Sequence, residues 1–176
     1  MKSIFNNTNF STCLSTITDE VFYICDDGGV GIPCRISDST SYDFKVINPK
    51  NKKIDFTKID SCVYHANDGR KCDFLLNDDT IACFIEIKSL TDFSNSWKSD
   101  SKKDDALDQI IETIKKIKLR FPTISLIHIY GIICLKPNLP TFTQSIQVAE
   151  QVRINKLLTE TGCPNLFIGN ELTFSN

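Results

Sequence analysis

The sequence predicts an α/β fold with a mixed central β-sheet flanked by helices. Strand-like segments dominate the first half of the chain, and helical and strand-like segments alternate in the second half. Hairpin-linked strands run antiparallel, whereas strands joined by a crossover helix run parallel, so both directions are expected in one sheet. Because no convincing linker interrupts the 176 residues, the whole chain, 1–176, is expected to form a single domain.

Several segments of the N-terminal half have strand patterns. A short helix is expected around 14–23. Segments 42–47 and 53–59 alternate polar and apolar residues on either side of a turn, which predicts an N-terminal hairpin with one solvated face. Segment 61–66 is expected to form another strand, which ends at the strong turn signal of 67–69.

The next hairpin carries charges where a strand is normally apolar. Segments 71–76 and 81–88 are rich in β-formers and are joined by a polar turn. Side chains alternate between the two faces of a strand, so Glu86 and Lys88 share a face. Asp73, on the partner strand, comes alongside them if the register of the hairpin allows it.

The C-terminal half alternates helix and strand patterns. A polar linker is expected over 89–105, and a wide apolar stripe at helical spacing predicts a helix over 104–120. The nearly continuous apolar run 123–135 indicates a central strand buried on both faces. A second helix is expected over 145–161, followed by a final strand or hairpin within 165–174.

Two carboxylates that converge beside a lysine suit the hydrolysis of a phosphodiester. Carboxylate oxygens are the ligands that Mg²⁺ prefers, and Mn²⁺ is the alternative ion. Such an ion polarises the phosphoryl group and lowers the pKa of a bound water. A lysine can orient the attacking water or offset charge that develops in the transition state.

The same residues resemble the signature of the PD-(D/E)XK nuclease superfamily. Asp73 is followed about a dozen residues later by Glu86-Ile87-Lys88, and Gln109 in the next helix matches a glutamine that several branches carry. The resemblance implies that Asp73, Glu86 and the carbonyl of Ile87 bind the metal. It also implies that Lys88 positions or activates water, and that Gln109 aligns the substrate or the lysine.

The resemblance covers residues 61–135, under half of the chain, and implies a restriction-endonuclease-like core to which the N-terminal hairpin is added. Two positions depart from the family pattern. Cys72 precedes the aspartate in place of proline, and Thr113 stands where one branch has a tyrosine. Members of this size often serve restriction, repair or antiviral (phage) defence, so the resemblance implies a nuclease that acts on DNA, with RNA as the alternative substrate. A partner protein or a homo-oligomer is also implied.

Two other interpretations stay open. The formal net charge of −2 gives no overall basic footprint for nucleic acid, which favours a catalytically inactive binding module or partner subunit with the same fold. Glu86 and Lys88 could alternatively form only a structural ion pair. The intact set of Asp73, Glu86, Lys88 and Gln109 argues against an inactive module, because an inactive site has no physical need to bury charge on a strand. The presence of Asp73 and Gln109 argues against a bare ion pair.

Basic residues near the predicted site are candidates for contacting phosphates. Those before the hairpin could equally be edge-strand charges, and those after it could belong to a solvated loop. The candidates for nucleic-acid binding are Arg70, Lys71, Lys98, Lys102 and Lys103.

Three further residues have a functional and a plain interpretation. Glu20 could join the metal site through an N-terminal helix, but a solvated surface acid is the preferred interpretation. His65 is expected to be structural rather than catalytic. His128, inside an apolar run, is expected to be a core histidine.

The eight cysteines and the N-terminus bear on the compartment. Cys72, Cys83 and Cys134 lie in apolar runs, where buried free thiols are common. The sequence contains no C-x-x-C pair, so no zinc site is expected. The N-terminus is too polar for a signal peptide, and no apolar run reaches membrane-spanning length. A reducing, cytoplasmic location without membrane contact is therefore expected.

Overall fold

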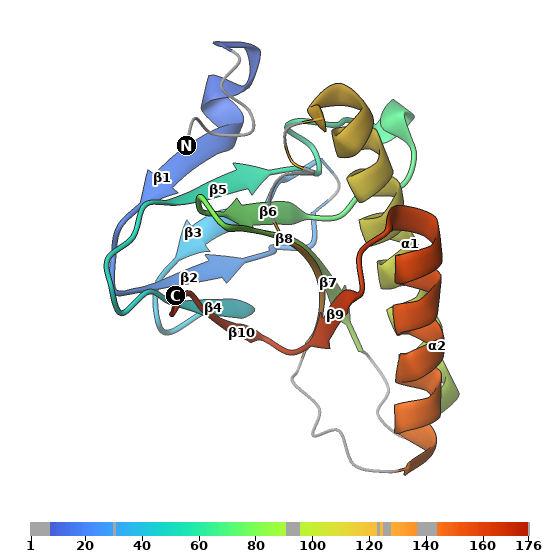
Figure 1. Ribbon diagram of the computed structural model, residues 1–176. Helices are drawn as coiled ribbons and strands as arrows, with labels where there is room; N and C mark the ends of the chain where they lie inside the picture. Colours follow the sequence, from blue (N-terminus) through green and yellow to red (C-terminus); the bar gives the residue numbers. More distant parts are fainter. Residues whose placement is uncertain are drawn as a thin grey trace.

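The computed structural model describes residues 8–29, 31–90, 96–122, 124, 128–136 and 144–175. They form an α/β structure with two mixed β-sheets and two long helices (Figure 1). Both helices, α1 (Ser96–Arg120) and α2 (Gln144–Thr161), lie on one face of the larger sheet. The smaller sheet packs against the other face, so the expectation that helices flank the sheet holds for one face only.

The larger sheet has six strands in the order β1-β5-β6-β7-β8-β9. The pairs from β1 to β7 are antiparallel, whereas β7–β8 and β8–β9 are parallel because α1 and α2 carry the chain back across the sheet. Its strands are β1 (Leu14–Ile17), β5 (Ile54–Lys58), β6 (Phe74–Asn77), β7 (Ile81–Ser89), β8 (His128–Lys136) and β9 (Asn165–Ile168).

The smaller sheet has four strands in the order β10-β4-β2-β3. The last strand, β10, runs parallel to β4, and the other pairs are antiparallel. Its strands are β2 (Val21–Cys25), β3 (Arg35–Ser37), β4 (Phe44–Ile47) and β10 (Glu171–Thr173).

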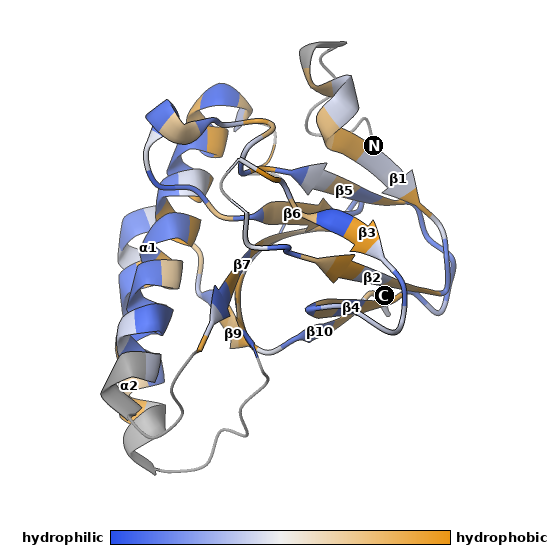
Figure 2. Ribbon diagram, turned by 180° about the vertical axis from the view of Figure 1, so that it is seen from behind, coloured by the Kyte–Doolittle hydropathy of each residue, from blue (hydrophilic) through white to orange (hydrophobic). Residues whose placement is uncertain are grey.

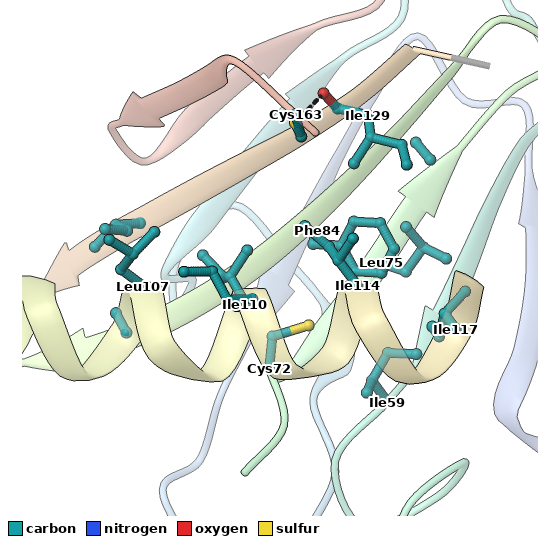
Figure 3. Packing of buried hydrophobic residues seen from close by; sticks show 14 of the residues in the cluster. Ile59, Cys72, Leu75, Phe84, Leu107, Ile110, Ile114, Ile117, Ile129 and Cys163 are labelled. Carbon is teal, nitrogen blue, oxygen red and sulfur yellow. Dashed lines mark hydrogen bonds between the residues drawn. The ribbon is translucent and has the colours of Figure 1, made fainter. Parts of the chain in front are cut away.

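Two apolar cores hold the three layers together. Under α1, Ile110 and Ile114 pack on Leu75 and Phe84 of the larger sheet, as Figure 3 shows. Between the sheets, the rings of Phe44 and Phe56 each contact Phe74, with centroids 5.8 and 5.6 Å apart. Figure 2 shows the strands between these cores as mainly hydrophobic and the helices as largely hydrophilic outside.

The N-terminal third differs from the prediction. A helix over 14–23 is wrong, because β1 and β2 occupy this segment, whose β-branched and aromatic residues favour strands. The predicted hairpin of 42–47 and 53–59 is also wrong: β4 and β5 lie there, but in different sheets. Segment 61–66 forms turns with one isolated bridge, Asp60–Tyr64, instead of a strand.

The C-terminal half agrees better with the prediction. The helix predicted over 104–120 begins earlier, at Ser96, and so takes up much of the expected linker. The strand predicted over 123–135 is β8, which begins at His128, while residues 123 and 125–127 lie outside the described part. The predicted second helix is α2, and 165–174 contains β9 and β10 in different sheets.

One disulfide joins Cys13, at the end of a short 3-10 helix, η1 (Thr8–Cys13), to Cys62. No local sequence pattern indicates that these two cysteines, 49 residues apart, form a bond. The prediction that Cys72, Cys83 and Cys134 are buried free thiols is confirmed. Within the described residues, no helix is long and apolar enough to cross a membrane.

Candidate active site

The hairpin of β6 and β7 brings Asp73 beside Glu86. The last paired residues of the ladder are Phe74 and Ile85; Asp73 directly precedes Phe74, and Glu86 directly follows Ile85. The amide of Asp73 donates to the carbonyl of Ile85 (3.1 Å), and a carboxylate oxygen of Asp73 accepts from the amide of Ile87 (2.6 Å). The register that the sequence left open therefore places both acids at the same end of the hairpin.

Helix α1 holds the segment that precedes Asp73. The amide of Cys72 donates to the hydroxyl of Thr113 (2.7 Å), and Arg70 pairs with Asp108 (2.7 Å). The ammonium of Lys116 donates to the carbonyl of Arg70 (2.7 Å). These contacts fix the backbone just before the first acid of the site.

Glu86 and Lys88 lie on the face of β7 that packs toward α1. The ammonium of Lys88 is 2.8 Å from an oxygen of Glu86 and 2.8 Å from an oxygen of Asp105 on α1. The amide nitrogen of Gln109, one helical turn further on, donates to the same oxygen of Asp105 (3.2 Å). The structure thus brings together the predicted Asp73, Glu86, Lys88 and Gln109.

Asp105 is the residue of this cluster that sequence reasoning missed. It was placed at the end of a polar linker, although its spacing of four residues from Gln109 puts the two on one helix face. It links the glutamine to the lysine, because both donate to its carboxylate. We define the acidic site as Asp73, Glu86, Lys88, Asp105 and Gln109.

Within the acidic site, burial makes it unfavourable for Asp73 and Glu86 to be ionised at the same time. Burial raises the pKa of Asp73 to about 7, and the nearby charge of Asp26 acts in the same direction, against the amide of Ile87 and the charge of Lys88. Burial raises the pKa of Glu86 well above its ordinary value, and the charge of Asp73 adds to this effect. Without a further positive charge, the pair therefore holds a proton near neutral pH.

The pKa values of Lys88 and Asp105 are shifted toward the charged form of each residue, unlike those of the two buried acids. Burial opposes the charged form of Lys88, but Glu86 and Asp105 outweigh this effect and raise its pKa. Partial burial opposes ionisation of Asp105, yet Lys88 and Arg70 lower its pKa. Lys88 is therefore positively charged and lies between the buried acid Glu86 and the ionised Asp105.

One carboxylate oxygen of Glu86 is available to bind a metal ion. The residue Glu86 is 3% exposed, and one of its carboxylate oxygens, Oε2, has no hydrogen-bond partner. An unpaired buried carboxylate oxygen is costly, and a divalent cation would satisfy it. In the described part of the chain, no group of three or more His, Cys, Asp or Glu side chains forms a metal site, so Asp73 and Glu86 would need the carbonyl of Ile87 or water as further ligands.

The basic candidates for nucleic-acid binding are scattered. Arg70 is half exposed near the acidic site and Lys102 is exposed on α1, whereas Lys71 is largely covered and pairs with Asp60 (3.3 Å). Lys103 is buried and pairs with Glu150 of α2 (2.9 Å), so it stabilises the contact between the helices. The side chain of Lys98 lies outside the described residues.

The other singled-out residues lie away from the acidic site. Glu20 is exposed in the turn before β2, at the opposite end of that strand from Asp26. His65 is exposed and begins a short 3-10 helix, η2 (Ala66–Asp68), where its amide donates to Asp68 (2.6 Å). His128 is exposed at the start of β8, so the expectation of a core histidine is wrong.

A second charged group lies near the acidic site and was also missed. Lys136, the last residue of β8, is 3.0 Å from a carboxylate oxygen of Asp43 and donates to the backbone carbonyl of Asp26 (2.8 Å). These contacts join the ends of the two sheets. Their sequence separations, of 93 and 110 residues, left no local signal to find them by.

No protein-family model, no curated protein and no solved structure matches this chain. The residues of the acidic site and their geometry therefore carry the functional inference.

Proposed function

We propose that this protein is a metal-dependent nuclease that hydrolyses phosphodiester bonds, with DNA as its substrate. The observation that carries the proposal is the unpartnered, buried carboxylate oxygen of Glu86, which lies beside a second acid and a lysine. The order β5, β6, β7, α1 and β8, with the acids on the central hairpin, supports a restriction-endonuclease-like core.

In this proposal Asp73, Glu86 and the carbonyl of Ile87 hold Mg²⁺ or Mn²⁺. The bound ion supplies positive charge that polarises the phosphodiester and acidifies a water ligand. Asp73 stays in place because the Ile87 amide donates to it, and Glu86 because it lies buried on a central strand. Binding of the ion would favour the ionised form of both carboxylates.

Lys88 acts on the attacking water and on the phosphoryl group. Its ammonium, held between Glu86 and Asp105, orients the attacking water and offsets the charge that develops on the phosphoryl oxygens. Gln109 fixes Asp105 from the following turn of α1, so the lysine keeps its position when substrate approaches. Arg70 and Lys102, exposed beside this cluster, contact the flanking phosphates.

The charge balance supports action together with a partner protein or as a homo-oligomer. The net charge is −2, and near the acidic site Arg70 and Lys71 are already paired with acids. Phosphate contacts from this chain alone therefore give weak binding. A role in defence or repair stays a prediction, and so does a reducing, cytoplasmic compartment, although the Cys13–Cys62 disulfide counts against a reducing one.

The test is cleavage of plasmid, linear duplex, single-stranded DNA and RNA by purified protein with Mg²⁺ or Mn²⁺. We expect metal-dependent cleavage of DNA, and a loss of about 100-fold or more in Glu86→Gln and Lys88→Met. Glu112→Gln changes a partly exposed acid on α1; it is the matched control and keeps full activity. If the protein binds Mn²⁺ but cleaves none of these substrates, alone or with its partner, it is an inactive binding module.

A further inference from the structure

The outer side of α2 carries no charge, although 24% of the residues of the chain are charged. Helix α2 packs on α1 and β9 and lies at the outside of the molecule (Figure 1). Successive residues of a helix turn by about 100°, so Val148 and Asn155 project on the side opposite the buried Leu157. We define the outer face of α2 as six exposed residues: Val148, Gln151, Val152, Asn155, Leu158 and Thr159.

All four charged side chains of α2 pair with α1 instead. The ion pairs are Glu150 with Lys103, Arg153 with Asp104, Lys156 with Asp108, and Glu160 with Lys115. A helix at the surface of a protein normally carries its charged residues on the side that faces water. The charges of α2 thus join the two helices, and the outer face is left with apolar and uncharged polar residues.

Half of the residues on the outer face are apolar. Val148, Val152 and Leu158 are 69%, 63% and 45% exposed. The residues of the face recur at intervals of three and four along the helix, so each is a neighbour of the next on the surface. Single exposed apolar side chains are common on proteins, but a row of them without charges is typical of a helix that packs on another helix.

The composition of the outer face fits a second copy of the same chain. In a dimer with a two-fold axis the face meets itself, so any charge on it would lie near a charge of the same sign. The amides of Gln151 and Asn155 and the hydroxyl of Thr159 each contain a donor and an acceptor, so they can pair with their own copies. A partner of different sequence is commonly selected by opposite charges, which this face does not supply.

The two amides in the middle of the face are also ordered within the chain. The side-chain amide of Gln151 donates to the side-chain oxygen of Asn155 (3.0 Å), one helical turn further on. Holding these side chains in place lowers the entropy cost of packing a second helix against them. The outer face is therefore uncharged, complementary to itself and partly ordered in advance.

We propose that this protein forms a homodimer in which the outer faces of two α2 helices pack together. The two-fold axis passes near Asn155, in the middle of the face, so that Asn155 lies beside the partner's Asn155. Since α2 is about 27 Å long and the contact is one helix wide, the interface is small and a Kd on the order of tens of micromolar is expected. No residue of the acidic site belongs to this face, so the dimer does not depend on the nuclease proposal.

Sedimentation equilibrium of the full-length protein, without metal or nucleic acid, tests the proposal. We expect monomer at about 1 µM and mainly dimer at about 500 µM. Val152→Glu should raise the Kd about tenfold or more, because it brings two like charges into the interface. Ile32→Glu makes a similar change at a 52% exposed apolar residue before β3, in the smaller sheet on the other side of the larger one, and should leave the Kd unchanged.

Cross-linking gives a second test that does not depend on Val152→Glu being folded. With oxidised glutathione, Asn155→Cys should form a disulfide-linked dimer, whereas Lys53→Cys, at an exposed position before β5, should stay monomeric. The proposal is overturned if Val152→Glu dimerises as tightly as the wild type, or if Asn155→Cys cross-links no faster than Lys53→Cys. A wild-type protein that is monomeric at about 500 µM also overturns it, and leaves the outer face to a protein of different sequence.

Discussion

The ammonium of Lys88 is shared between two carboxylates, at 2.8 Å from Glu86 on its own strand and 2.8 Å from Asp105 on α1. Glu86 is buried, whereas the side chain of Asp105 is 42% exposed at the edge of the site. The lysine therefore bridges the sheet and the helix, and any substrate that approaches it also meets Asp105.

Asp105→Asn should lower kcat about tenfold and leave the affinity for Mn²⁺ unchanged, because Asp105 positions Lys88 and does not bind the metal. Since Asp105 helps to raise the pKa of Lys88, its loss should also move the alkaline limb of the rate profile to lower pH. Steady-state DNA cleavage across pH measures both effects. Glu112→Gln, on the same helix and paired with Lys115, is the control. A pH profile identical to that of the wild type would show that Asp105 does not act on the lysine.

Asp73→Asn should stabilise the metal-free protein at alkaline pH. The folded-state pKa of Asp73, about 7, lies above the ordinary value of 3.8, so the folded protein binds the extra proton between these values. Its contribution to stability is therefore present at low pH and is lost as the pH rises through about 7. We expect the variant to match the wild type near pH 4 and to exceed it by about 1–3 kcal/mol at pH 8.

Chemical denaturation at the two pH values, with a chelator present, measures this difference. Glu112→Gln should show no such gain, because Glu112 is only partly buried and is paired with Lys115. An Asp73→Asn variant that is less stable than the wild type at pH 8 would mean that the carboxylate is ionised and well stabilised without a metal.

Reduction of the Cys13–Cys62 disulfide should lower the free energy of unfolding by about 2–4 kcal/mol, because the bond closes a long loop in the unfolded chain. The double variant Cys13→Ser/Cys62→Ser should show the same loss without a reductant. Thiol titration of the denatured, unreduced protein should count the six remaining cysteines. Eight free thiols in freshly purified protein would contradict the bond.

Gly131→Val should destabilise the fold by about 1–3 kcal/mol through overpacking. A Cβ at this position of β8 would lie 3.2 Å from Ile110 of α1 and 3.4 Å from Leu157 of α2. The glycine thus lets both helices approach the sheet closely. Thermal and denaturant unfolding measure the effect, and Gly169→Val, where a Cβ meets nothing within 4 Å, is the control. Equal stabilities of the two variants would argue against close packing at Gly131.

The hairpin of the site could be predicted from the sequence because the patterns that specify it, strand alternation and a turn, lie within one short segment. Alternation fixed the shared face of Glu86 and Lys88, and the turn between β6 and β7 set a register that places Asp73 and Glu86 at the same end of the hairpin. The crossover helix and the parallel strand β8 were predicted for the same reason, since an apolar stripe and an apolar run are visible in single segments.

The role of Asp105 and the assembly of the smaller sheet could not be predicted, because they depend on contacts between segments far apart in the sequence. Asp105 looked like part of a linker, and only the packing of α1 on β7 brings it to Lys88. The smaller sheet is assembled from β2, β3, β4 and β10, and β10 joins β4 across more than a hundred residues. The pairing of segments 42–47 and 53–59 was wrong because two strands that follow each other can enter different sheets, which no pattern within them reveals.

The location of a bound Mn²⁺ tests the central claim most directly. Titration of the paramagnetic ion into ¹⁵N-labelled protein broadens the amide signals of residues close to it. The account predicts early and selective broadening at Asp73, Glu86, Ile87 and Lys88, and its loss in Glu86→Gln, which stays folded. Broadening that is spread over the surface, centred on another part of the chain, or unchanged in Glu86→Gln would contradict the account.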